Sequence, residues 1–98
     1  MTYLIEIFLP ISVKDARSKV EAVRRELVER FGGATFHINA PAEGLWLDDG
    51  TVESDRIVVA EVMAETLDTV WWGSYRRRLE AAFSQEEILI RATETTCL

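Results

Sequence analysis

The sequence predicts an α+β domain in which one antiparallel sheet carries two helices on a single face. Strand-like and helix-like patterns follow the order β-α-β-β-α-β along 98 residues, a length that suits one domain. Two predicted strands, Tyr3–Leu9 and Asp55–Met63, are the most continuously apolar, as expected of central strands. Two interleaved βαβ units define the ferredoxin-like fold, whose first and third strands are central. We therefore expect a single ferredoxin-like sandwich over residues 1–98, with a four-stranded antiparallel sheet.

The first strand is followed by an amphipathic helix. Tyr3–Leu9 ends at Pro10, which removes a donor from the strand ladder. Ser12 and Asp15 form a pair similar to a capping box, so the helix is expected to begin at Ser12. Its inward stripe comprises Ala16, Val20, Val23, Leu27 and Phe31. Gly32–Gly33 is expected to close the helix, because glycine adopts the left-handed cap at little cost.

The middle of the chain predicts a hairpin with an elaborated first arm. Thr35–Asn39 alternates apolar and polar residues, as a half-buried strand does. Residues 40–44 interrupt it, and Leu45–Leu47 either resumes that strand or forms a separate short one. Asp48–Gly50 is a strong turn signal that leads toward Asp55–Met63. We expect a hairpin over residues 35–63.

The last third predicts a second helix and a final strand. Asp68 is the expected N-cap, with Thr66 as the alternative. The inward stripe of this helix comprises Trp72, Tyr75, Leu79 and Phe83. Glu87–Ala92 is expected to be the final strand, and the polar residues 93–98 are expected to fray.

Composition limits the classes of partner. The formal net charge is −6, which argues against nucleic acid and against anionic membrane surfaces. No apolar run approaches the length of a membrane span, and the first ten residues lack the basic start of a signal peptide. The single cysteine, Cys97, permits no internal disulfide and suits a reducing compartment. We expect a cytoplasmic protein with no metal or cofactor motif.

Strand parity predicts an unusually apolar open face of the sheet. The helix-facing set is expected to contain Tyr3, Ile5, Ile7, Phe36, Ile38, Val58, Ala60, Val62, Ile88 and Ile90. The open face then carries Leu4, Glu6, Phe8, Thr35, His37, Asn39, Val59, Glu61, Met63, Leu89 and Arg91. Half of this second set is apolar, which is too much for a plain solvent surface. We therefore expect a homodimer in which two sheets pack face to face with two-fold symmetry.

Four chemistry-bearing residues fall on this open face: Glu6, His37, Glu61 and Arg91. Two carboxylates and an imidazole in a semi-enclosed dimer cavity are suited to proton transfer, and Glu with His can also bind a metal. The simpler interpretation, which we favour, is structural: Glu6 pairs with Arg91, Glu61 is solvated or bonded across the dimer, and His37 lies on the surface of an edge strand. One histidine per chain argues against a transition-metal site.

Aromatic residues form a second concentration. Trp46 and Trp71 are candidate ligand-binding residues at the helix–sheet edge, although core packing explains Trp72 and Tyr75 better. The arginine run at 76–78 is expected to pair with nearby acids such as Glu80 rather than to bind an anion.

The residues from 40 onward also carry a resemblance. The runs A-P-A-E-G-L-W, D-R-I-V-V-A-E-V-M and W-W-G-S-Y-R-R-R-L-E-A-A-F-S-Q-E-E-I-L-I-R resemble small bacterial proteins of ferredoxin-like fold whose function is uncharacterised. The wider architecture is similar to the dimeric α+β barrel superfamily, which includes small isomerases, monooxygenases and ligand-binding regulatory domains. The resemblance implies a fold, and no member's catalytic motif is present to be carried over.

Two functions follow from these observations. The first is a homodimeric module that binds a small molecule or partner through its sheet face or a loop. The alternative is a small cofactor-free enzyme of the dimeric-barrel type, with Glu61 or Glu6 as base and His37 or Arg91 orienting the substrate.

Overall fold

The computed structural model describes residues 1–38, 42–48 and 51–98 of the chain, and at 42–44, 46–48 and 51–55 it describes the backbone alone. Within these residues the elements follow the expected order. They are β1 (Thr2–Pro10), α1 (Ala16–Phe31), β2 (Thr35–Phe36), β3 (Ala42–Asp48), β4 (Thr51–Ala64), α2 (Thr69–Ala82) and β5 (Ile90–Thr95). No helix among them is long and apolar enough to cross a membrane.

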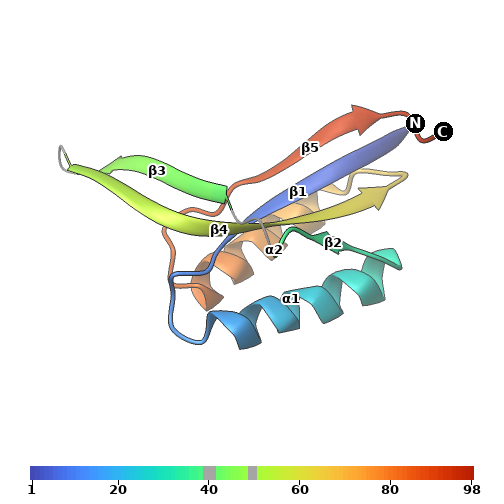
Figure 1. Ribbon diagram of the computed structural model, residues 1–98. Helices are drawn as coiled ribbons and strands as arrows, with labels where there is room; N and C mark the ends of the chain where they lie inside the picture. The colour runs from blue at the N-terminus through green and yellow to red at the C-terminus, as the bar shows by residue number, and fades with distance from the viewer. Residues whose placement is uncertain (39–41, 49–50) are drawn as a thin grey trace.

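The antiparallel sheet has the strand order β2-β4-β1-β5, with β1 and β4 at its centre. Both helices cover one face and leave the other open (Figure 1). This is the ferredoxin-like arrangement that the sequence predicts. A fifth strand, β3, was expected only as one of two alternatives, and it pairs with the first half of β4 from Ala42↔Ile57 to Asp48↔Thr51. Since β1 ends at Pro10, opposite Ile57, the β3/β4 ribbon projects beyond the sheet.

The core lies between the sheet and the two helices. Its members are large apolar side chains from β1, β4, both helices and the turn before β5: Ile5, Ile7, Leu9, Val20, Val23, Leu27, Ala60, Val62, Trp72, Tyr75, Leu79, Phe83 and Ile88. Strand parity therefore predicted the buried face of the central strands correctly. Ile38 is an exception, because β2 ends at Phe36 and leaves Ile38 48% exposed.

The start of α1 differs from the prediction. The helix begins at Ala16, not at Ser12, after Asp15 adopts a left-handed backbone with φ 58° and makes no side-chain cap. The reason lies in β4: the N–H of Ile11 donates to the carbonyl of Arg56 at 2.8 Å, and the Ser12 hydroxyl accepts from the N–H of Arg56 at 3.3 Å. The chain is still held against β4 where the helix was expected to start. The predicted end is correct, since Gly32 has φ 81° and donates to Val28.

The last strand also lies further along the chain than expected. It spans Ile90–Thr95 rather than Glu87–Ala92, although the carbonyl of Leu89 already accepts from the N–H of Phe8 at 3.0 Å. Its register with β1 runs from Ile7↔Ile90 to Thr2↔Thr95. Backbone pairing with β1 orders residues 93–95 regardless of their polarity, so only the last three residues follow the strand.

Candidate functional site

A row of charged residues crosses the open face of the sheet. In the strand register, Glu6 lies opposite Glu61 on one side and opposite Arg91 on the other. His37 follows β2 and donates its backbone N–H to Val59, next but one to Glu61 in β4. The register thus brings together the four residues that the sequence placed on this face. We call Arg91, Glu6, Glu61 and His37 the charge row.

Each carboxylate of the charge row has its own partner. The Nε atom of Arg91 lies 2.9 Å from Glu6 Oε1, and the Nε2 atom of His37 lies 2.7 Å from Glu61 Oε1. The two glutamates are the less exposed members, with side chains 19% and 29% exposed. Like charges directly opposite each other destabilise a sheet. The two flanking partners offset this repulsion, as the structural reading from sequence expected for Glu6 and Arg91.

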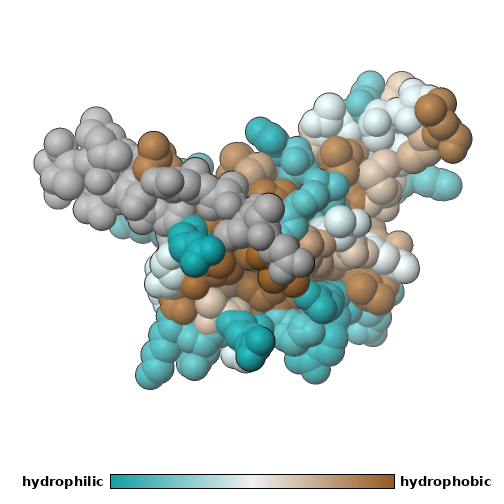
Figure 2. Space-filling view, viewed as in Figure 1, coloured by the Kyte–Doolittle hydropathy of each residue, from teal (hydrophilic) through white to brown (hydrophobic). Residues whose placement is uncertain are grey.

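Apolar side chains surround the charge row. Phe8 lies opposite Val59 and Leu4 opposite Met63, so one apolar pair flanks the row on each side. The guanidinium of Arg91 also lies 5.0 Å from the centroid of the Phe8 ring. Of the flanking residues, Met63 and Leu89 are 42% and 51% exposed. In the space-filling view, hydrophilic side chains gather over α1, while hydrophobic patches interrupt the sheet layer (Figure 2).

This arrangement offers polar recognition and proton exchange within an apolar frame. A carboxylate and an imidazole in hydrogen-bond contact can pass a proton to a bound molecule, whereas a carboxylate held by a guanidinium is suited to binding. Across the described ranges, no group of three or more His, Cys, Asp and Glu side chains comes close enough to hold a metal ion.

Trp71, a ligand-binding candidate from the sequence, packs against residues of both helices. Its ring stacks on Tyr75 at a centroid distance of 4.8 Å, and the Arg30 guanidinium lies 4.1 Å above it. These contacts hold Trp71, half-buried, in the packing between the two helices. The side chain of Trp46, the other candidate, lies outside what the structure describes.

Two of the three arginines of α2 are paired with acids, as the sequence suggested. Arg76 lies 3.9 Å from Glu80, and Arg78 forms an ion pair with Glu26 of α1. Glu26 also lies 3.5 Å from the hydroxyl of Tyr75. Burial, followed by the nearby Glu26 carboxylate, raises the pKa of Tyr75 well above its ordinary value, while Arg78 opposes this shift.

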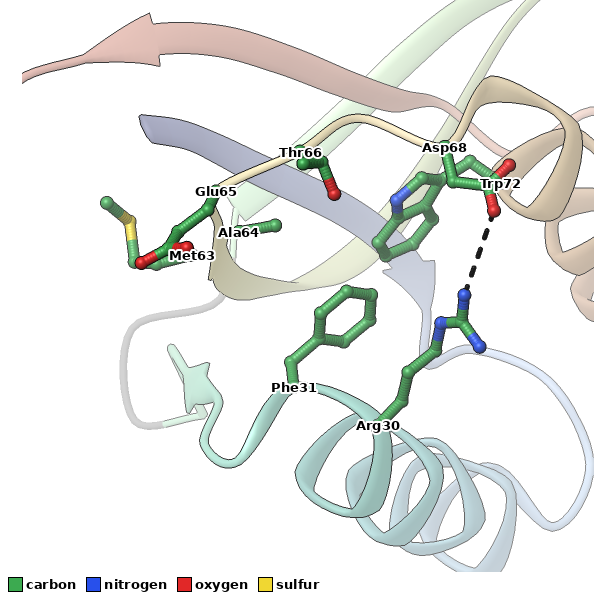
Figure 3. Close-up of a pocket in the computed structure, with 8 residues that line it drawn as sticks. All are labelled: Arg30, Phe31, Met63, Ala64, Glu65, Thr66, Asp68 and Trp72. Carbon is green, nitrogen blue, oxygen red and sulfur yellow. Dashed lines mark ion pairs between the residues drawn. The ribbon is translucent and has the colours of Figure 1, made fainter. Parts of the chain in front are cut away.

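An open cleft of about 590 Å³ lies near the C-terminal end of α1 (Figure 3). It forms between the last turn of α1, the end of β4 and the first turn of α2. Its lining comprises Arg30, Phe31, Met63, Ala64, Glu65, Thr66, Asp68 and Trp72. Sequence reasoning placed Trp72 in the core alone and missed this cleft, because its walls come from three segments that no local pattern connects.

The element order and the sheet topology define a small α+β domain of the ferredoxin-like class. Among solved structures, the chain is similar to the periplasmic divalent cation tolerance protein CutA from Archaeoglobus fulgidus, with a TM-score of 0.66, 16% identity, and 97% of this chain and 84% of that chain covered. The divalent cation tolerance protein from Thermus thermophilus gives a TM-score of 0.65 at 15% identity over the same shares.

An enzyme shares the architecture as well. A phage SAM lyase in complex with S-methyl-5′-thioadenosine gives a TM-score of 0.65 at 19% identity, covering 95% of this chain and 81% of that chain. No protein-family model matches the sequence, and no curated protein is similar to it. At these identities the structural similarity establishes the fold alone.

Proposed function

We propose that this chain is a self-associating binding module whose open sheet face packs against another copy of the chain. The observation that carries the proposal is the charge row itself: its charges are paired within the chain and framed by exposed or half-buried apolar side chains. Covering such a surface costs the desolvation of two ion pairs, which pairing lowers but does not remove, whereas burial of the apolar frame favours association. Two copies related by a two-fold axis, as in a dimeric α+β barrel, are the simplest arrangement.

The β3/β4 ribbon supports self-association. From Thr51 to Arg56 the strand β4 pairs with β3 and not with β1. A two-stranded ribbon of this kind is marginally stable in water by itself. A second copy that packs against the ribbon would supply the missing support.

The similar structures and the residue composition bear on two further parts of the proposal, metal binding and location. The CutA proteins are named for divalent cation tolerance. Because the residues that the structure describes bring no cluster of metal ligands together, our proposal includes no metal. A cytoplasmic location is part of the proposal and rests on the single cysteine, whereas the Archaeoglobus protein is described as periplasmic.

Native mass spectrometry of three variants tests the self-association. Leu89→Glu and Met63→Glu place a charge on exposed positions of the open face, and we expect both to convert an oligomer into a monomer. Val70→Glu is the matched control, because Val70 is 81% exposed on α2, in the helix layer. A wild-type monomer at micromolar concentration would contradict the proposal. A closed ring of three or more copies would contradict the two-fold arrangement.

The His37–Glu61 contact favours a second candidate, a small enzyme that performs proton chemistry. A carboxylate 2.7 Å from an imidazole nitrogen orients that ring, and Glu6 with Arg91 would hold the substrate beside it. The phage lyase supports this candidate only in that the fold accommodates an enzyme.

Retention of a ligand separates the two candidates. In native mass spectra of protein purified without additives, the enzyme reading expects extra mass that Glu61→Gln removes. Glu94→Gln is the control, since exposed Glu94 lies opposite Tyr3, away from the charge row. Extra mass retained equally by Glu61→Gln would contradict the enzyme reading.

A further inference from the structure

The cleft between α1 and α2 contains a buried hydrogen-bond donor that has no partner within the described chain. Trp72 is 7% exposed, and the side-chain hydrogen bonds among residues 1–38, 42–48 and 51–98 leave its indole N–H without an acceptor. In Figure 3 the indole nitrogen faces the space beside Thr66 and Ala64. Water can accept from this donor in the open cleft, so a ligand that displaces the water keeps the donor satisfied only if it supplies an acceptor itself.

The wall next to this donor is aromatic and apolar. Phe31 stacks on Trp72 with a centroid distance of 5.3 Å and an interplanar angle of 13°. Phe31 is only half-buried and lines the cleft. Met63 and Ala64 complete the apolar wall. Because the two rings are nearly parallel, a flat molecule that lies beside Trp72, in the plane of its indole ring, would overlap Phe31 and place its own edge toward the indole N–H.

The charges around the cleft select against anions. Arg30 is engaged, because it lies 3.9 Å from Asp68 and stacks over Trp71. Asp68 in turn accepts a hydrogen bond from the backbone N–H of Trp71, which occupies the first turn of α2. Glu65 makes no ion pair within the part of the chain that the structure describes, so its carboxylate leaves the rim negative.

We propose that this cleft binds a small, flat, uncharged heteroaromatic molecule that presents a carbonyl oxygen or ring nitrogen to the indole N–H of Trp72. Thr66, whose hydroxyl points into the cleft in Figure 3, adds a group that can donate or accept at the edge of the ring. A volume of about 590 Å³ is within the ordinary range for such ligands. The site lies apart from the charge row and shares only Met63 with the open face.

Titration of ¹⁵N-labelled protein with nicotinamide and adenosine tests the proposal. The three tryptophans give three indole N–H signals, and we expect the signal of Trp72 to move in a saturable way, with a Kd of about 1 mM or tighter. Nicotinate has the same ring as nicotinamide with a negative charge, so it should bind at least about threefold more weakly. If neither nicotinamide nor adenosine moves this signal, or if nicotinate binds as tightly as nicotinamide, the proposal is wrong.

Two substitutions identify the groups that act. Glu65→Gln should strengthen nicotinate binding by about threefold and leave nicotinamide unchanged, a difference that a purely structural role of Glu65 would not produce. Thr66→Val should weaken the binding of nicotinamide without lowering the thermal stability of the protein, because Thr66 is exposed. Unchanged nicotinate affinity in Glu65→Gln together with unchanged nicotinamide affinity in Thr66→Val would overturn the assignment of the ligand to this cleft.

Discussion

Tyr75 shows how one residue connects the two helices and responds to pH. Its ring is 1% exposed, and its hydroxyl faces Glu26, which is also the partner of Arg78. Burial is the main cause of the raised pKa of Tyr75, and the Glu26 carboxylate adds to it. The neutral phenol is therefore the form that the folded state favours.

Substitution of Tyr75 by Phe should remove a loss of stability in alkali. Because the pKa of Tyr75 is raised above its ordinary value of 10.0 in the folded state, the folded protein holds a proton that the unfolded chain releases above that pH. The contribution of Tyr75 to the free energy of unfolding is therefore complete well below pH 10. It falls as the pH rises, and about 1 kcal/mol is lost near pH 11. Urea unfolding of both proteins at about pH 8 and pH 11 measures this. An equal alkaline loss in Tyr75→Phe would show that Tyr75 is not its source.

Within the charge row, removal of the Arg91 guanidinium should destabilise the folded protein. Arg91→Ala leaves Glu6 facing Glu61 without its guanidinium, so we expect a loss of about 1 kcal/mol in the free energy of unfolding. Adding Glu6→Gln to Arg91→Ala should restore part of that loss. Arg77→Ala, at an exposed position of α2, is the control and should change stability by less than about 0.5 kcal/mol. If the effects of Arg91→Ala and Glu6→Gln on the free energy of unfolding simply added, the two side chains would not be coupled.

At the scale of elements, the two helix starts show what the sequence could predict. Asp68 and Ser12 have the same local signature, an N-cap residue type before an amphipathic stripe. Asp68 caps α2 through the N–H of Trp71 at 3.0 Å, whereas Ser12 is held by Arg56 of β4. The difference comes from a contact 44 residues away in the sequence, which no local pattern contains.

The caps can be compared directly. Asp68→Ala should cost about 1 kcal/mol, because it leaves an N–H of the first turn of α2 without its acceptor. Ser12→Ala should cost less than about 0.5 kcal/mol, since Ser12 is exposed and lies outside α1. Chemical denaturation of both variants gives the comparison, and equal losses would contradict the structure at the start of α1.

The register of α2 is tested by a buried position within the helix and by its buried C-cap residue, Phe83. Trp72→Ala and Phe83→Ala should each cost about 3–5 kcal/mol, because both side chains lie in the core. Val70→Ala, at an 81% exposed position of the same helix, should cost little. Thermal or urea unfolding measures all three. Small losses at both core positions would mean that α2 presents another face to the sheet.

At the scale of the whole molecule, the sequence predicted layers better than sites. Period-two and period-3.6 patterns report burial, and burial is what the ferredoxin-like sandwich organises. The same parity brought Glu6 and Glu61 together on the open face, although their distances to Arg91 and His37 needed the register. The cleft at Trp72 could not be predicted, since it depends on where the end of α1 meets the loop after β4.

The melting temperature should depend on protein concentration. If the open face is covered by a second copy, unfolding also dissociates the assembly, so dilution favours the unfolded chain. For two chains of this length the melting temperature should rise by about 3 °C for each tenfold increase in protein concentration. Leu89→Glu should abolish the dependence, because it disrupts the face without touching the core, and Val70→Glu should preserve it. A wild-type melting temperature that stays constant over a hundredfold range of concentration would mean that the apolar frame of the charge row remains in water.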